Sequence, residues 1–287
     1  ASFPSFALAW RFSEEPWLNA DWLSMAKLRV GWGQVGNAGV SPYQIYPTFG
    51  AVQYPDHTPG NDAEYIVAVV PTNIANPGLK WETTRQWNGG LDLGFFDGRL
   101  ALTVDLYDKI TFDLLQKKMI SGTSGFTTTW VNDGSIRNQG LEISVDATPV
   151  AYGDFEWNVS GQISFNRNSI ASLGASDGGG EIYLAPGHKR QCNYFEGATI
   201  GTSNYMQSTA NIFIEGFPVG LFYGYKTNGI VQTGERGYTL EEGVYSGPGS
   251  IKYCDLNGNG YIESGDRTII GNPNPDFTYG FSTMFRW

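Results

Sequence analysis

The chain has 287 residues, of which 15% are aromatic, 38 are glycine and 16% are charged, whereas soluble domains carry about 25% charged residues. The formal net charge of −10 excludes the basic surface that nucleic-acid-binding proteins need, so we expect no nucleic-acid partner. No run of about 18 apolar residues occurs, which excludes a transmembrane helix, and two cysteines, Cys192 and Cys254, are too few for a disulfide scaffold.

Alternation of apolar and polar residues with a period of two is the dominant pattern, and helical periodicity is almost absent. In chain order the alternation predicts about seven strands, near residues 5–12, 26–35, 81–95, 99–114, 138–148, 155–167 and 276–287. In the fourth segment, for example, Leu102 and Val104 alternate with Thr103 and Asp105. We therefore expect an all-β protein with antiparallel strands.

The turn between the third and fourth strands sets their register. Asp97-Gly98 favours a two-residue type I′ hairpin, because both central residues of that turn need a positive φ. The hairpin pairs Phe95 with Leu100, Leu93 with Leu102 and Leu91 with Val104. The apolar faces of the two strands then lie on the same side of the sheet, a match that a slip of one residue would break.

The connections between strands alternate between short turns and long loops. Short turns follow the first, third and fifth strands, and long loops span 36–80, 115–137 and 168–275. Segregation of short turns to one side and long loops to the other is typical of outer-membrane barrels, whereas a soluble sandwich has no reason for it. We therefore expect part of an antiparallel transmembrane β-barrel whose long loops are extracellular.

Two charged residues, Arg85 and Asp108, lie on the apolar face of the predicted strands. Each is about ten residues from the turn, which corresponds to roughly 23–25 Å of height in a tilted strand. That height is the far rim of the apolar band, where we expect the two side chains to interact diagonally. Five tryptophans fit the interface belt of such a protein: Trp10, Trp81, Trp87, Trp157 and Trp287.

The segment 255–266, DLNGNGYIESGD, has the spacing of an EF-hand calcium loop. Asp255, Asn257 and Asn259 occupy positions 1, 3 and 5, the Tyr261 carbonyl position 7, and Asp266 position 12, where glutamate is usual. Calcium is one interpretation. The other is a turn held by Asx hydrogen bonds that binds no metal.

Aromatic residues are frequent in the long loops, where they could stack on a sugar, pack a peptide or contact a partner protein. They could equally form small cores that hold the loops in shape. The candidates for substrate or partner binding are Tyr43, Tyr46, Trp130, Tyr194, Phe195, Tyr223 and Tyr225. No HExxH or P-loop motif occurs, and no GxSxG elbow between a strand and a helix is predicted, so we expect no catalytic residues, no organic cofactor and no enzymatic activity.

Several long motifs resemble the carboxy-terminal half of SusC/RagA-type TonB-dependent outer-membrane transporters. These motifs are KLRVGWGQVGNAGVSPYQ, NPGLKWETTRQWNGGLDLGFFDGRL, DGSIRNQGLEISVDATPV, EGFPVGLFYGYKTNGIV and DRTIIGNPNPDFTYGF. The resemblance spans nearly the whole chain. It implies a 22-stranded barrel with an amino-terminal plug in the outer membrane of a Gram-negative bacterium. It also implies that the barrel is energised by TonB and imports oligosaccharides or peptides with a SusD-like surface lipoprotein.

Compared with that family pattern, the chain shows no plug, no TonB box and no closing strands after Trp287. We therefore expect residues 1–287 to be one part of a larger barrel, with TonB acting through the missing amino-terminal part. Two alternatives stay open from the residues alone: a soluble calcium-binding β-sandwich that binds carbohydrate at the cell surface, and a secreted β-rich glycoside hydrolase.

Overall fold

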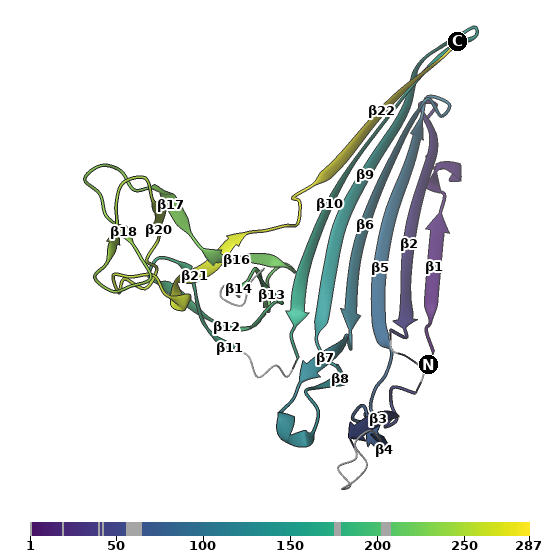
Figure 1. Ribbon diagram of the computed structural model, residues 1–287. Coiled ribbons are helices and arrows are strands. Elements are labelled where there is room, and N and C mark those ends of the chain that lie inside the picture. The colour runs from purple at the N-terminus through teal and green to yellow at the C-terminus, as the bar shows by residue number, and fades with distance from the viewer. Residues whose placement is uncertain are drawn as a thin grey trace.

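A computed structural model describes residues 2–18, 20–39, 41, 43–55, 65–174, 179–201 and 208–287. Its largest unit is a seven-stranded antiparallel sheet with the order β1-β2-β5-β6-β9-β10-β22 (Figure 1). The strands are β1 (Ser5–Trp10), β2 (Leu23–Asn37), β5 (Glu82–Phe95), β6 (Leu100–Phe112), β9 (Ser135–Tyr152), β10 (Phe155–Ser172) and β22 (Thr278–Arg286). None of the helices in these residues is long and apolar enough to span a membrane.

The strands of this sheet are neighbours in the order in which they occur along the chain. The predicted all-antiparallel architecture is therefore confirmed. Strands β9 and β10 are longer than the alternation indicates, at 18 residues each, because they keep pairing with each other beyond the point where their apolar pattern fades. Their pairing continues to Ile170 opposite Ile136 and, after an irregularity, to Ser172 opposite Ser135.

The predicted β5–β6 register is confirmed, with Phe95 opposite Leu100 and Leu93 opposite Leu102. The Arg99 amide donates to the Phe96 carbonyl over 3.2 Å, and Asp97 and Gly98 have φ angles of 56° and 83°, as a type I′ turn requires. Phe96 also has a positive φ, of 56°, which the turn alone does not predict. Its amide donates to the Trp22 carbonyl over 3.1 Å, so the neighbouring connection helps to hold this conformation.

The sheet has two chemically different faces, which we call the apolar face and the polar face. On the apolar face, Leu8, Leu106 and Phe281 are 69%, 57% and 71% exposed. No second sheet covers this face in the described part of the chain (Figure 1). In a water-soluble sandwich a second sheet would bury such a surface. Here the apolar face is exposed, so the sandwich alternative is not favoured.

The charges on the apolar face are paired differently from the sequence-based expectation. Asp108 does not interact with Arg85. Instead it accepts two hydrogen bonds from Arg137 on β9, at 2.9 and 2.5 Å. The Arg85 guanidinium lies 5.5 Å from the centre of the Phe112 ring. Arg137 competes with Arg85 for this carboxylate because β9 pairs with the other edge of β6, which puts both arginines diagonal to Asp108.

The long connections contain strands of their own, which the sequence did not indicate because these strands are short and lack alternation. Two hairpins occur, β3 (Phe49–Pro55) with β4 (Tyr65–Pro71) and β7 (Leu115–Met119) with β8 (Thr128–Asn132). A second, five-stranded sheet has the order β11-β12-β15-β16-β21. Its strands are β11 (Gly179–Ala185), β12 (His188–Glu196), β15 (Asn211–Ile214), β16 (Leu221–Tyr225) and β21 (Arg267–Gly271). Short pairs complete this region: β13 (Thr199–Ile200) with β14 (Ser208–Thr209), β17 (Thr227–Ile230) with β20 (Ile251–Tyr253), and β18 (Gly237–Tyr238) with β19 (Tyr245–Ser246).

The compact hydrophobic core lies in the five-stranded sheet, beside the large one. Its buried members are Ile182, Cys192, Ile212, Ile214, Leu221 and Tyr223. Cys192 is a free thiol, as is Cys254, so no bridge joins them. The described residues between β10 and β22 thus form a folded unit with its own interior.

Candidate functional site

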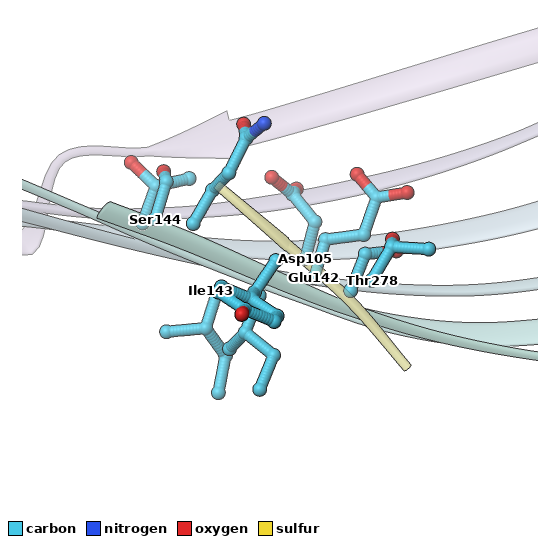
Figure 2. A pocket seen from close by; sticks show the side chains of 10 residues that line it. Asp105, Glu142, Ile143, Ser144 and Thr278 are labelled. Carbon is cyan, nitrogen blue, oxygen red and sulfur yellow. The ribbon is translucent and has the colours of Figure 1, made fainter. Parts of the chain in front are cut away.

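The polar face of the large sheet carries hydrophilic side chains arranged in rows that run across the strands. One row consists of Arg29, Gly90, Asp105, Glu142, Ser164 and Thr278, each opposite the next in the strand register. Figure 2 shows the side chains of Asp105, Glu142 and Ser144 on one side of the sheet and Ile143 on the other. The row is polar because successive residues of a strand point to opposite faces.

Arg29 is the centre of an ion-pair cluster on this face. Its Nε and Nη2 donate to the two carboxylate oxygens of Asp92, both over 2.8 Å, and its Nη2 lies 2.9 Å from Asp105 Oδ1. Asp105 is two strands away, so the guanidinium must cross β5 at Gly90. A Cβ atom at Gly90 would lie 2.5 Å from Asp105 Oδ1 and 2.6 Å from Arg29 Cζ, so any larger residue would displace these two side chains from their contact.

Two hollows lie beside this cluster. The first, of about 380 Å³, is lined by Asp105 and Glu142 together with hydroxyl and amide side chains, among them Thr103, Ser144 and Gln162. The second, of about 490 Å³, is lined by Tyr107, Lys109 and several amides: Gln86, Asn88, Asn138 and Asn166. Tyr107 donates to Asn166 Oδ1 over 3.2 Å. Such surfaces offer donors and acceptors to a hydroxylated or peptidic ligand.

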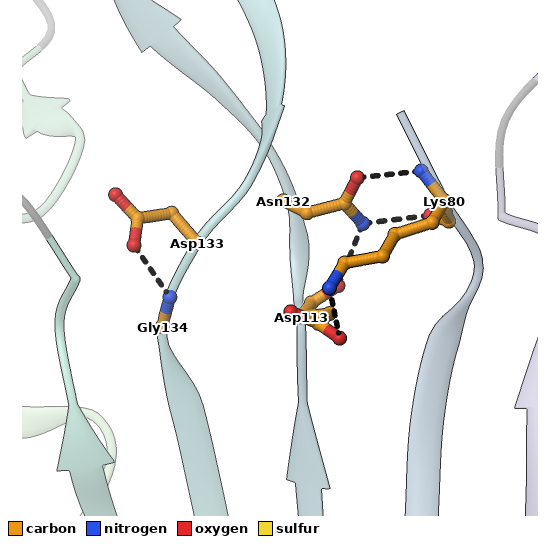
Figure 3. A network of polar contacts seen from close by, with 5 residues as sticks. All are labelled: Lys80, Asp113, Asn132, Asp133 and Gly134. Carbon is orange, nitrogen blue, oxygen red and sulfur yellow. Dashed lines mark hydrogen bonds and ion pairs between the residues drawn. The ribbon is translucent and has the colours of Figure 1, made fainter. Parts of the chain in front are cut away.

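A second polar network lies where β5, β6 and β8 meet the long connections (Figure 3). The Asn132 side chain accepts from the Lys80 amide over 2.7 Å and donates to the carbonyls of Lys80 and Asp113, over 2.7 and 2.9 Å. Lys80 Nζ also pairs with Asp113 Oδ2 at 2.9 Å. Asn132 therefore joins three chain segments and fixes the base of the β7–β8 hairpin.

The aromatic residues that the sequence singles out do not form one surface. Tyr43 and Tyr46 are 74% and 58% exposed in the segment before β3. Trp130 is half-buried on β8, and the Lys117 ammonium lies 5.3 Å from its ring centre. The remaining four belong to the five-stranded sheet: Tyr194, Phe195, Tyr223 and Tyr225.

These four aromatic side chains mainly pack within the sheet. Phe195 stacks on Phe213 with ring centroids 4.7 Å apart, Tyr194 packs against the core, and Tyr225 contacts Tyr253 edge to face at 6.1 Å. Tyr223 is 7% exposed, and its burial raises the pKa of the phenol to about 12. Tyr194 and Tyr223 thus belong to a small core, whereas Phe195 is 40% exposed, and a binding role for these residues stays a prediction.

Arg267 links the strands of that sheet. Its guanidinium lies 4.2 Å from the centre of the Tyr223 ring, and its Nη1 pairs with Glu196 Oε2 at 2.9 Å. Glu196 also accepts from the Thr209 hydroxyl. Burial by itself would raise the pKa of Glu196, but the bonds from Thr209 and Arg267 and the Arg267 charge outweigh burial and lower it.

The segment predicted as a calcium loop uses its oxygens for backbone hydrogen bonds. Asp255 accepts from the amides of Gly258 and Gly260 at 2.6 and 2.8 Å. Asn257 and Asn259 accept from the amides two residues further on. Within the described ranges no three His, Cys, Asp or Glu side chains converge on a point that could hold a metal.

Asp266, at position 12 of the same segment, is fully buried. Its carboxylate accepts from the amides of Leu256, Asn257 and Glu263, at 2.8, 3.3 and 2.9 Å. The Tyr261 amide donates to Asn259 Oδ1. This arrangement fits the Asx-turn interpretation, and calcium binding stays a prediction.

Comparison with known proteins identifies the family. The TonB dependent receptor-like β-barrel family matches residues 1–277. The chain therefore belongs to the family of TonB-dependent receptor β-barrels, as the resemblance of its motifs predicted.

Two relatives and one solved structure show how much of such a protein the chain represents. It is 35% identical over 292 residues to a TonB-dependent receptor of Formosa agariphila and 32% identical over 290 residues to the TonB-dependent receptor SusC of Bacteroides thetaiotaomicron. All of the chain aligns, yet it spans 27% and 26% of these relatives. The RagAB peptide transporter has the same fold, with a TM-score of 0.71 at 24% identity over 99% of this chain and 28% of that one.

Proposed function

We propose that the chain is part of a TonB-dependent importer of oligosaccharides or peptides in the outer membrane of a Gram-negative bacterium. In this role the apolar face contacts lipid and the polar face lines the barrel interior. The observation that carries the proposal is the combination of an uncovered apolar face with a continuous polar face on one sheet of a TonB-dependent receptor barrel. A transmembrane barrel alternates in this way because one face meets hydrocarbon and the other meets water.

The remaining parts of the importer follow from the same proposal. The chain works with the rest of the barrel, with a plug and TonB, and with a SusD-like surface lipoprotein over the long-loop end. The similarity to the RagAB peptide transporter supports peptides as one cargo class, and the resemblance of the motifs to SusC/RagA-type transporters suggests oligosaccharides as the other. The importer itself is not an enzyme, because it moves its substrate without changing it.

The lipid contact can be tested with the full-length protein in vesicles of brominated phosphatidylcholine. Single cysteines, in a background with Cys192 and Cys254 replaced by serine, would carry a fluorescent label at Leu106 or Phe281 and, as matched controls on the polar face, at Glu142 or Thr103. We expect the brominated acyl chains to quench the first pair strongly and the second pair weakly. Equal quenching would contradict the assignment of the faces.

The orientation of the loops can be tested on intact cells with a membrane-impermeant maleimide. A cysteine at Glu241, in the long connection, should be labelled, whereas a cysteine at Asp154, in the short β9–β10 turn, should be labelled only after lysis. The reverse pattern would overturn the orientation. Cargo can then be assigned by disrupting the gene and comparing growth on oligosaccharides and on peptides, and growth unchanged on both would reject import of either class.

A further inference from the structure

Three exposed arginines gather on the apolar face near the long-loop end. Arg85 on β5 and Arg137 on β9 share one row through Ile110, two strands apart, which is about 10 Å. Arg167 on β10 lies opposite Gln139, so it is a diagonal neighbour of Arg137 at about 7–8 Å. All three are exposed, and we call them the arginine cluster.

The arginine cluster keeps a net positive charge. Asp108 binds Arg137 in a fork, with Nε and Nη2 donating to its two oxygens. Among the described residues, Arg85 and Arg167 form no ion pair with an acidic side chain. Three cations and one anion leave a charge of about +2 on a chain whose total is −10.

The cluster lies at the boundary of the apolar band. Arg85 is about ten residues from the end of β5, which is roughly 25 Å of height for a tilted strand, the height of the band in such barrels. On the same face, Trp87 packs near Phe6 and Trp32, with ring centroids 5.8 and 6.1 Å away. Aromatic residues of this kind mark the level of lipid headgroups.

We propose that the arginine cluster binds the phosphate of an anionic membrane lipid in the leaflet at the long-loop end. Arginine matches phosphate geometry, because its planar fork donates two hydrogen bonds at once. The Asp108 fork holds the Arg137 plane while its remaining N–H groups stay available. The apolar residues next to the cluster, such as Leu106, would contact the acyl chains of the same lipid. This site rests on the proposed membrane-spanning role and adds a specific lipid ligand to it.

The test uses the full-length protein in phosphatidylcholine vesicles that contain trace spin-labelled phosphatidylglycerol or, separately, spin-labelled phosphatidylcholine. The spectrum separates lipid held at the protein surface from mobile lipid. We expect the protein to hold phosphatidylglycerol about fivefold more strongly than phosphatidylcholine. The variant R85Q/R137Q/R167Q should lower this preference to near onefold, and R11Q/R99Q/R286Q, which removes three exposed arginines at the short-turn end, should leave it unchanged.

The experiment distinguishes rejection of the lipid site from rejection of the proposed membrane-spanning role. If the protein holds phosphatidylglycerol and phosphatidylcholine equally strongly, the phosphate site is rejected but the membrane-spanning role stays intact. If the protein holds neither lipid, both proposals are overturned. An equal loss of preference in the control variant would also reject the site, since it would show a general charge effect. Displacement by inorganic phosphate, but not by sodium chloride of the same ionic strength, would assign the cluster to a soluble anion instead.

Discussion

Gly90 shows how one residue decides a contact between distant parts of the chain. The absence of a side chain lets the Arg29 guanidinium pass over β5 to Asp105. The sequence places Asp92 and Asp105 on the polar face, but it does not indicate that Arg29 meets them. The signal that could have found the cluster is the Gly-Gly pair at 89–90, because glycine within a strand often marks a close approach.

Calcium binding by the segment 255–266 is a prediction at the residue scale. Calorimetric titration of the full-length protein with calcium should release less heat in Asp255→Ala than in the wild type, because position 1 supplies a carboxylate ligand. Asp276→Ala, outside the segment, is the matched control. Identical isotherms for the wild type and Asp255→Ala would leave the Asx turn as the sole role of the loop.

Glu196 predicts a pH dependence of the five-stranded sheet. Its pKa is lower in the folded state than its ordinary value, through the bonds from Thr209 and Arg267 and against the effect of burial. Its stabilising effect is therefore complete above the ordinary pKa and is lost as the pH falls through the folded pKa. Hydrogen exchange of β12 and β16, corrected for intrinsic rates, should accelerate between about pH 5 and pH 3.

The variant Glu196→Gln provides the comparison for this pH dependence. It keeps the shape of the side chain but cannot change charge, so its exchange should vary less over the same pH interval. Glu235→Gln is a matched control, because Glu235 is partly exposed and pairs with Lys252 at 3.0 Å outside this sheet. If the wild type and Glu196→Gln respond alike to acid, Glu196 is not the responsible group.

At the scale of elements, the long connections are held by side-chain bonds to backbone. Asn132 joins the base of the β7–β8 hairpin to the segment before β5. Asn168 and Asn274 anchor the segment before β16 of the five-stranded sheet. Asn168 Oδ1 accepts from the Val219 amide over 2.7 Å, and Asn274 Nδ2 donates to the Val219 carbonyl over 3.0 Å. Asparagine suits these positions because its amide can accept and donate at once.

Removal of the Asn132 side chain should loosen the β7–β8 hairpin without unfolding the sheet. Asn132→Ala leaves the Lys80 amide and two carbonyls without their partner, a local cost of about 1–3 kcal/mol. Hydrogen exchange should rise at residues 76–80 and 113–119 and stay constant in β9 and β10. Thr128→Ala, an exposed position on the same hairpin, should have little effect, and equal effects of both variants would contradict the role of Asn132.

At the scale of the whole molecule, the large sheet has strand edges that only a closed barrel can satisfy. Within the described residues β1 pairs with β2 alone and β22 with β10 alone. Barrels span membranes because closure leaves no backbone group without a partner in hydrocarbon. We therefore expect both edges to pair with further strands in the complete protein.

Closure of the barrel predicts slow hydrogen exchange at the β22 amides that point to the open edge of the large sheet. In the full-length protein, alternate amides of β22 that do not bond β10 should exchange as slowly as those that do. The amides of the exposed Glu241–Gly243 turn provide a fast reference in the same sample. Fast exchange at every second residue of β22 would show that this edge stays open.

The sequence by itself determined the strands of the large sheet and their antiparallel arrangement, because a period of two and a type I′ turn are local signals. Its long motifs indicated the family. The tertiary structure decided which side chains meet. Register across a connection such as 36–80 depends on strand pairing that no local pattern encodes, so Arg29 with Asp92, and Asp108 with Arg137, appear only after the strands are assembled. The same holds for the five-stranded sheet, whose short strands are stabilised by burial against one another, a property of the packed unit.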